Sequence, residues 1–288
     1  IALLAEIALP CIGVVTNVQS IHLERLGSIE RIAQAKAELV NALPPEGVAL
    51  LNGDDPRVRA MGAQTRARRI LYYGLRPDND LWADQVQGRG LEGITLHFHW
   101  QGQTVPADLP LLGTHSVWTA LAAAGVGLVE GLSWTQIITG LQRLSKPLRM
   151  IAVPGIRSTT ILDDTYNAGP LSTTAALEFL GTLGGRAVAV LGDMLELGAE
   201  EEEGHRQVGR KAAQTVAKLI AVGPRARIIA EEARANGMSH HDIHTAKNHE
   251  EALAYLKDLL TPGDYVLVKG SRGMAMETIV TALREETS

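Results

Sequence analysis

Several features that would assign this chain to a special class of protein are missing from its sequence. It has one cysteine, Cys11, in 288 residues, which excludes an internal disulfide framework and is typical of the reducing cytoplasm. No apolar run approaches the roughly 20 residues that span a bilayer, and no signal peptide is visible. The net charge is -5, whereas nucleic-acid binding needs a basic face. We therefore expect a cytoplasmic protein that neither inserts into a membrane nor binds nucleic acid.

What the sequence does contain is enough apolar residues for a full core. It is 45% hydrophobic and 20% charged, and its length corresponds to two domains of about 150 residues each. Cys11 has apolar neighbours, so we expect it in the core. The chain begins at Ile1 rather than at methionine, and residues 1–9 have the pattern of the end of a helix. For this reason we expect the chain to be a fragment of a longer protein.

The second half of the sequence alternates between short β-branched segments and longer helical segments. This alternation predicts an α/β fold with a parallel, doubly wound sheet. The change of pattern near residues 151–155 predicts domains at residues 1–153 and 154–288. The expected strands after this boundary are residues 158–162, 187–191, 219–222 and 265–268. The expected helices are residues 170–183, 199–217, 226–236, 249–260 and 274–285.

The first half has a more mixed pattern. Residues 94–100 alternate between apolar and polar side chains, which predicts an antiparallel strand with one solvated face. Apolar residues recur with a helical period over residues 29–40, and Ser28 is the expected N-cap of that helix. Further strands are expected at residues 11–16, 48–51 and 69–73, and further helices at residues 115–129 and 133–144.

The most informative segment reads Ile-Leu-Asp-Asp-Thr-Tyr-Asn-Ala-Gly-Pro-Leu-Ser and covers residues 161–172. A strand ends in Asp163 and Asp164, a polar loop follows, and Pro170 suits the first turn of the next helix. Open α/β sheets bind their ligands at the carboxyl ends of the strands. The segment therefore predicts a site for a nucleotide, a metal or a charged substrate.

A second strand ends in the segment Leu-Gly-Asp-Met-Leu-Glu-Leu-Gly. Its aspartate, Asp193, follows the strand directly. If the two strands are neighbours, Asp193 lies beside Asp164 at the same edge of the sheet.

A third strand ends in Val-Lys-Gly-Ser-Arg-Gly, which opens a helix. Two cations and a hydroxyl lie at a helix N-terminus, supplied by Lys269, Arg272 and Ser271. This combination predicts an anion pocket suited to a carboxylate. This segment is not a phosphate-binding loop, because the pattern G-x-x-x-x-G-K-S/T occurs nowhere in the sequence.

Three polar residues in the first half form a weaker candidate site. Asn17 ends the first expected strand, His22 follows in the loop, and Lys36 lies on the next helix. The group suits a metal or a phosphate, and the alternative is a loop histidine with a solvated lysine.

Two more candidates precede the domain boundary. Gly-Thr-His-Ser-Val-Trp-Thr opens a helix with His115, Ser116 and Thr119, which either touch a ligand or form an ordinary helix start. Arg149 lies at the expected domain junction, where an arginine either binds a phosphate bidentately or faces solvent.

The three strand-end segments, in this order and spacing, resemble the Mur ligase superfamily. Members of that family have an N-terminal domain for a UDP-sugar, a central ATP-binding domain and a Rossmann-like C-terminal domain for the incoming amino acid or dipeptide. The chain resembles the later part of the central domain followed by the C-terminal domain with its mostly parallel sheet. The family's phosphate loop would then lie upstream of Ile1, so we expect the fragment alone to be inactive.

The resemblance is closest to the branch that adds D-alanyl-D-alanine to UDP-N-acetylmuramoyl-tripeptide in peptidoglycan synthesis. It implies ATP-dependent amide formation through an acyl phosphate, with ATP and Mg²⁺ as cofactors and a monomeric enzyme. The alternatives are a sister ligase that adds another amino acid, and a non-catalytic dipeptide-binding module.

The resemblance also implies roles for single residues. His22 corresponds to a magnesium ligand, Lys36 to a catalytic lysine that is carbamylated and holds a second magnesium ion, and Arg149 to an arginine on the ATP phosphates. The expected nucleotide-binding residues are Asn17, His115, Ser116, Thr119, Arg149 and Asp164, although Ser116 and Thr119 stand where the family usually has asparagine. The expected substrate-binding residues are Tyr166, Asn167, Asp193, Lys269, Ser271 and Arg272.

Overall fold

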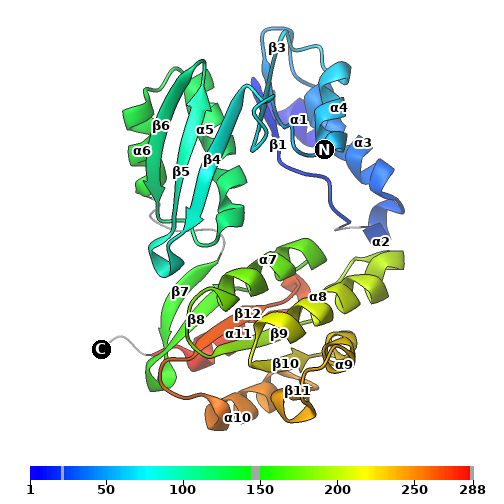
Figure 1. Cartoon of the computed structure of the whole chain (residues 1–288). Helices are drawn as coiled ribbons and strands as arrows, with labels where there is room; N and C mark the ends of the chain where they lie inside the picture. The colour runs from blue at the N-terminus through cyan, green and yellow to red at the C-terminus, as the bar shows by residue number, and fades with distance from the viewer. Residues whose placement is uncertain (21–22, 144–149, 286–288) are drawn as a thin grey trace. The chain divides into compact units, whose positions relative to one another are not determined.

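The computed structural model describes residues 1–20, 23–143 and 150–285. It divides into two compact units, Ile1–Ser145 and Lys146–Ser288, each built on a six-stranded sheet. Figure 1 shows the elements of both units. The expected domain boundary after residue 153 lies inside strand β7 (Ile151–Gly155), which pairs antiparallel with β8 (Thr159–Asp164) and so belongs to the second sheet.

The sheet of the first unit is mixed, with strands in chain order from β1 to β6. The first four strands are parallel, and the last three form an antiparallel meander. Gln101 and Gly102, both with positive φ, make the tight turn between β5 and β6. The strands are β1 (Ile12–Val15), β2 (Val48–Asn52), β3 (Arg69–Gly74), β4 (Leu81–Gly88), β5 (Ile94–Trp100) and β6 (Gln103–Leu109).

The helices of the first unit confirm the periodicity seen in the sequence. Ser28 caps α3 as expected, and its hydroxyl accepts a hydrogen bond from the backbone N–H of Arg31 at 3.3 Å. Ser133 caps α6 through a capping box with Gln136. The helices are α1 (Ala2–Ala8), α2 (Leu23–Leu26), α3 (Ile29–Asn41), α4 (Pro56–Ala60), α5 (Val117–Val129) and α6 (Trp134–Gln142).

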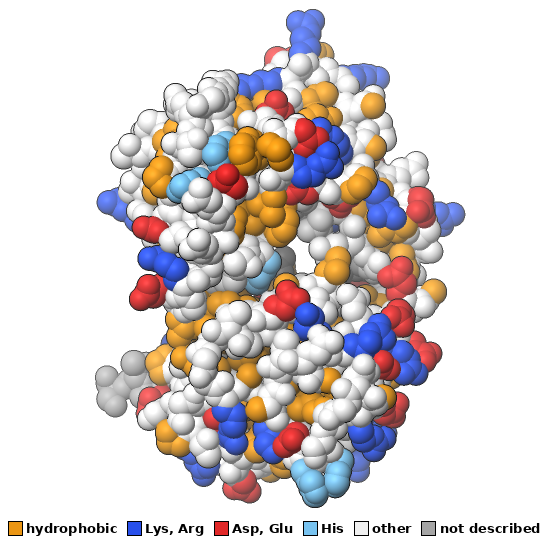
Figure 2. Space-filling model, in the orientation of Figure 1, with side chains coloured by type: hydrophobic (Ala, Val, Ile, Leu, Met, Phe, Trp, Pro, Cys, Tyr) orange, Lys and Arg blue, Asp and Glu red, His pale blue; other side chains and the backbone are white. Residues whose placement is uncertain are grey.

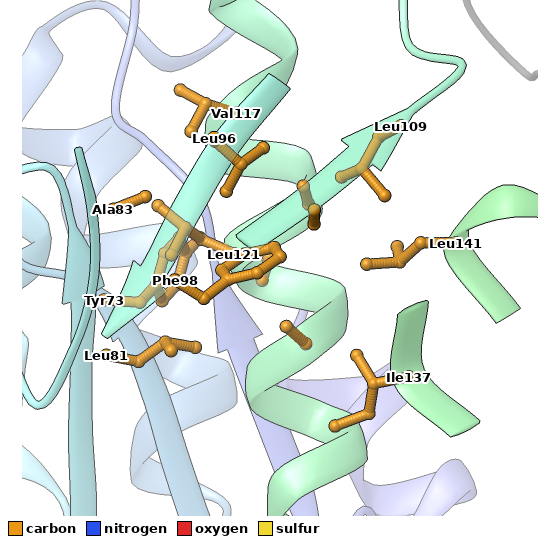
Figure 3. Close-up of a cluster of buried hydrophobic side chains, with 14 of the residues drawn as sticks. Tyr73, Leu81, Ala83, Leu96, Phe98, Leu109, Val117, Leu121, Ile137 and Leu141 are labelled. Atoms are coloured by element: carbon orange, nitrogen blue, oxygen red, sulfur yellow. The ribbon is translucent and has the colours of Figure 1, made fainter. Parts of the chain in front are cut away.

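The main core of the first unit lies between α5 and the sheet. The buried face of α5 packs on strands β2, β3 and β4, and Figure 3 shows Leu121 of this helix against Phe98 of β5. Tyr73 is fully buried and its hydroxyl donates a hydrogen bond to the carbonyl oxygen of Val15 at 3.4 Å. The alternation expected over residues 94–100 is confirmed, because Ile94, Leu96 and Phe98 face this core.

The second unit is a doubly wound sheet with strand order β11-β10-β9-β12-β8-β7, as the alternating pattern predicts. Its interior pairs are parallel, and helices cover both faces (Figure 1). The remaining strands are β9 (Ala187–Gly192), β10 (Lys218–Val222), β11 (Ile243–Ala246) and β12 (Tyr265–Lys269). The helices are α7 (Pro170–Gly181), α8 (Glu201–Thr215), α9 (Arg227–Ala235), α10 (His249–Leu259) and α11 (Glu277–Leu283).

The surface corrects one expectation from the sequence. Cys11 is exposed, so the prediction of a core position was wrong. It precedes edge strand β1, where its carbonyl oxygen accepts the N–H of Val48 at 2.8 Å while its side chain stays outside the core. On the face shown in Figure 2, the Lys and Arg side chains are interspersed with Asp and Glu. Within the part of the chain that the structure describes, no helix is both long and apolar enough to cross a membrane.

Asp264 provides a test of how the second unit is held together. Its carboxylate is 2% exposed and accepts hydrogen bonds from Arg186 at 2.6 and 2.8 Å and from the N–H of Thr261 at 2.8 Å. Burial raises the pKa of Asp264, but these hydrogen bonds outweigh burial and lower it overall. We expect Asp264→Asn to lower the free energy of unfolding at pH 7 by about 2 kcal/mol in urea titrations, because charge-assisted bonds are lost.

The control is Asp242→Asn, which breaks the more exposed ion pair of Asp242 with Lys218. Partly exposed pairs contribute little, so the control should lose less than about 1 kcal/mol. Since the pKa of Asp264 is lowered by folding, its contribution is present at neutral pH and is lost as the pH falls below the ordinary aspartate pKa of about 4 and through the lowered pKa of the folded state. Equal losses in the two variants would contradict the structural role of Asp264.

Candidate functional site

Three loops of the second unit meet at the carboxyl edge of its sheet. They follow β8, β12 and β9, and β12 lies between the other two strands. The register places Lys269, the last residue of β12, opposite Asp164 on one side and Leu191 on the other. The strands that end in Asp164 and Asp193 are therefore not neighbours, and a lysine-bearing strand separates them.

A buried ion pair joins β12 to β8. The Lys269 Nζ atom lies 2.5 Å from Asp164 Oδ2 and donates a second hydrogen bond, 2.8 Å long, to the carbonyl oxygen of Asn167. The two side chains are 1% and 9% exposed. The Lys269 ammonium group is thus neutralised within the protein, and it fixes the loop that follows β8.

Ser271 connects all three loops. Its backbone N–H donates to the carbonyl oxygen of Asp193 at 3.0 Å. Its hydroxyl accepts the N–H of Leu195 at 2.8 Å and donates to the carbonyl oxygen of Ala168 at 3.4 Å. Ser271 is 4% exposed, so its hydroxyl holds the loops together rather than facing solvent.

Asp193 binds the turn before α9 instead of lying beside Asp164. Its Oδ1 atom accepts the N–H groups of Arg225 at 3.0 Å and Ala226 at 2.7 Å. Gly223 has φ +108°, and a Cβ there would lie 2.5 Å from the same oxygen, so glycine is required for this close approach. Burial raises the pKa of Asp193 despite these hydrogen bonds.

Some side chains of these loops face solvent, where they are accessible to a ligand. Tyr166 is 60% exposed. The Arg272 side chain is 65% exposed, and one of its nitrogens pairs with Glu277 at 2.9 Å. A guanidinium group has five donors and binds carboxylates bidentately. Of the three residues expected to form an anion pocket, Arg272 is therefore at the surface, whereas Lys269 and Ser271 are buried.

Two non-glycine residues in these loops have left-handed backbone conformations. Glu196 has φ 64° and Ala275 has φ 48°. Such conformations cost about 1 kcal/mol or more each and are concentrated at functional sites. Their presence in the loops after β9 and β12 supports a ligand-binding role for this edge.

In the first unit, Lys36 of α3 contacts the loop that follows β1. Its Nζ atom donates a 2.6 Å hydrogen bond to the carbonyl oxygen of Asn17. Burial lowers the pKa of Lys36, and the negative charge of Asp55 partly opposes this. A lysine with a lowered pKa holds a larger fraction of neutral, nucleophilic amine at neutral pH.

The sequence analysis missed the importance of Asp54, which follows β2 in the run Asn-Gly-Asp-Asp. Its Oδ2 atom accepts the indole N–H of Trp118 at 2.8 Å and the N–H of Leu75 at 2.7 Å, and its Oδ1 atom accepts from Asn79 at 3.1 Å. The available signal was two carboxylates directly after a fully buried strand, the same signal that identified Asp164.

The other residues predicted to bind a ligand in the first unit and at the domain junction differ in their exposure and contacts. The Ser116 hydroxyl donates to the carbonyl oxygen of Leu112 at 2.7 Å, which is typical of an ordinary helix start, whereas Thr119 is exposed and His115 is half-buried. His22 and Arg149 lie outside the described residues. Among the residues that the structure describes, no group of three or more His, Cys, Asp or Glu side chains is arranged to hold a metal ion.

Removing one partner of the buried ion pair is expected to destabilise the second unit. Asp164→Asn leaves the Lys269 charge buried without a counterion, so the free energy of unfolding in urea should fall by about 3 kcal/mol or more. Replacing both residues, as Asp164→Leu with Lys269→Met, removes the uncompensated charge and should recover part of that loss. The control is Glu202→Gln in the exposed pair of Glu202 with Arg206, which should cost less than about 0.5 kcal/mol. A double variant less stable than Asp164→Asn would contradict this account.

Comparison with known proteins agrees with this arrangement. The Mur ligase middle domain model matches residues 2–127, and the model for the Mur ligase, glutamate ligase domain matches residues 148–272. The UDP-N-acetylmuramoyl-tripeptide--D-alanyl-D-alanine ligases of Mycobacterium tuberculosis (strain CDC 1551 / Oshkosh) and Bacillus subtilis are 38% and 33% identical over 98% and 99% of this chain. The chain covers 60% and 62% of those two proteins.

Solved structures confirm the α/β architecture of the two units. MurF from Acinetobacter baumannii is similar with a TM-score of 0.85 at 26% identity, over 97% of this chain and 61% of that one. MurF from Thermotoga maritima, solved in complex with ADP, has a TM-score of 0.82 at 25% identity, over 98% of this chain and 63% of that one. The two family models together span most of the sequence, the relatives exceed 30% identity and the fold is shared. The chain therefore belongs to the Mur ligase family.

Proposed function

We propose that this chain is the central and C-terminal part of an ATP-dependent ligase that adds D-alanyl-D-alanine to UDP-N-acetylmuramoyl-tripeptide in peptidoglycan precursor synthesis. The observation that carries the proposal is the similarity, over 98–99% of the chain, to ligases with that name at 33–38% identity. The chain spans about 60% of the length of those relatives, so the activity is proposed for the whole protein.

The second unit binds the incoming dipeptide in this proposal. Arg272 holds the dipeptide carboxylate, because its guanidinium group is exposed and offers paired donors. Tyr166 and Asn167 line the same pocket on the loop after β8. Four buried side chains keep the three loops in place, and their burial and hydrogen bonds support this role. They are Asp164, Asp193, Lys269 and Ser271.

The first unit binds the nucleotide. A helix N-terminus after Gly113, with the half-buried His115 and the exposed Thr119, offers N–H, imidazole and hydroxyl groups that suit a nucleotide. Asn17 and Lys36 belong to the same unit. Bound ATP supplies the γ-phosphoryl group that activates the substrate carboxylate for attack by the dipeptide amine. Arg149 is proposed to bind its phosphates.

The described side chains do not form a metal site as they stand. A carbamate on Lys36 would add two oxygens that share one negative charge to this part of the first unit, and the family pattern would add the imidazole of His22 as a further ligand.

A phosphate-release assay tests the proposed reaction. The full-length gene product should release phosphate only when ATP, UDP-N-acetylmuramoyl-tripeptide and D-alanyl-D-alanine are all present. Glutamate or a diamino acid in place of the dipeptide should lower the rate at least about tenfold, because a dipeptide pocket leaves buried polar groups unpaired with a shorter amine. Residues 1–288 alone should release none, since they contain no G-x-x-x-x-G-K-S/T run. Turnover by residues 1–288, or a preference for another amine, would contradict the proposal.

Carbamylation of Lys36 is a separate prediction. The neutral amine attacks CO2, an N–C bond forms and one proton is released, so the lowered pKa of Lys36 favours the reaction at neutral pH. With ¹³C-labelled bicarbonate, NMR should detect a carbamate carbon in the wild type, and this signal should be lost in Lys36→Arg.

The matched control is Lys211→Arg. Lys211 is also partly buried, but its Nζ atom is held by the carboxylate of Glu178 at 2.6 Å. This variant should keep the carbamate signal. A signal that survives in Lys36→Arg would assign the carbamate to another amine.

A further inference from the structure

A fully buried histidine lies behind the loop that follows β9, and neither the motifs nor the proposed mechanism uses it. His205 of α8 is 0% exposed. Its Nε2 atom accepts the backbone N–H of Met194 at 3.1 Å, and its Nδ1 atom lies 2.6 Å from the carbonyl oxygen of Glu201. A carbonyl oxygen only accepts hydrogen bonds, so the proton is on Nδ1 and Nε2 is unprotonated.

The Met194 N–H is one of three successive backbone contacts that hold this loop. The Asp193 carbonyl oxygen and the Leu195 N–H both bond to Ser271, on the loop after β12. Met194, between them, is held by His205 of α8. The loop is therefore attached to two different elements over three residues, and the left-handed Glu196 follows immediately.

Charged groups surround His205 on the elements that pack against it. Glu201 lies one turn earlier on α8, Asp193 lies on the loop itself, and Arg225 precedes α9 and pairs with Glu201 at 2.8 Å. Burial is the largest influence and lowers the pKa of His205, while Asp193 and Glu201 oppose it. The imidazole is therefore neutral at neutral pH, which its hydrogen bond from Met194 requires.

The acceptor of the buried Met194 N–H is His205 Nε2, and protonating or removing that nitrogen takes the acceptor away. A buried backbone donor without a partner is costly, so the loop would move to satisfy it. Such a movement carries Leu195 and Glu196 with it, and Leu195 is the residue bonded to Ser271. The position of the strained Glu196 segment thus depends on one imidazole nitrogen.

We propose that His205 is a positioning residue for the dipeptide: its unprotonated Nε2 atom holds Met194 and, through the bond of Leu195 to Ser271, keeps the loop that carries Arg272 in the geometry that binds the incoming amine substrate. This inference rests on the proposed function. It concerns the dipeptide half of the reaction and leaves nucleotide binding unaffected.

Two substitutions separate the two nitrogens of His205. The terminal group of Gln reaches the place of Nε2, so His205→Gln retains an acceptor for Met194. The shorter Asn reaches only the place of Nδ1, so His205→Asn keeps the contact with Glu201 and loses the one with Met194. The control is His241→Asn, because His241 is an exposed histidine whose ring lies tilted against that of His240, with the centroids 3.7 Å apart.

Steady-state kinetics of the full-length gene product provide the readout. His205→Asn should raise the KM for D-alanyl-D-alanine about tenfold, the effect expected for one lost buried hydrogen bond, and leave the KM for ATP unchanged. His205→Gln and His241→Asn should stay within about threefold of the wild type. Equal dipeptide KM values for His205→Asn and His205→Gln in folded proteins would overturn the proposal.

The pH dependence is a second measurement that does not need the Asn variant. Protonation of Nε2 removes the acceptor for Met194, so the dipeptide KM of the wild type should rise as the pH falls below the ordinary histidine pKa of about 6.5. The amine of the dipeptide also titrates, but it affects the wild type and His205→Gln equally. His205→Gln should therefore show a smaller rise, and identical profiles would overturn the proposal. A wild type that ligates no dipeptide refutes the proposed function instead, so the two failures are distinguishable.

Discussion

The buried ion pair of Asp164 with Lys269 is the interaction on which the edge of the second sheet depends. Removing two charges from water costs on the order of several kcal/mol per ion, so each group persists at this depth only because the other is present. The pair joins β8 to β12, and the bond from Lys269 to Asn167 extends it to the following loop. Ser271 then joins this loop to the one after β9.

Buried and exposed residues of the candidate site therefore have different structural roles. The buried aspartates, lysine and serine use their hydrogen-bonding capacity inside the protein, and Arg272 and Tyr166 face solvent. The glycines of the same motifs allow close packing: a Cβ on Gly270 would lie 3.2 Å from the Gly192 Cα atom and 2.7 Å from Met276. Several motif residues that the sequence predicts to bind a ligand are buried and hold the strand-end loops together.

Three of the four strands missed by the sequence analysis share a physical cause. β6, β7 and β11 lie at the edges of their sheets, where one side of the strand is unpaired and fewer side chains are buried. β6 and β7 contain Pro106 and Pro154, which edge strands tolerate because no neighbour needs the missing N–H. β4 is interior, but its polar second half, Asp-Gln-Val-Gln-Gly, carries no apolar pattern. The interior strands β2, β8, β9, β10 and β12 were predicted to within two residues at each end, because both of their faces are buried.

Local patterns in the sequence were enough to predict the fold class, the family and the three strand-end motifs, since hydrophobic periodicity and the residues at strand ends are local properties. Which motifs become neighbours depended on strand order, which local patterns do not encode: β12 separates the strands of Asp164 and Asp193, and Asp193 binds the turn before α9. The role of His205 depended on tertiary structure as well. A histidine in a helix has no distinguishing sequence pattern, and only its burial and two hydrogen bonds identify the nitrogen that holds the loop.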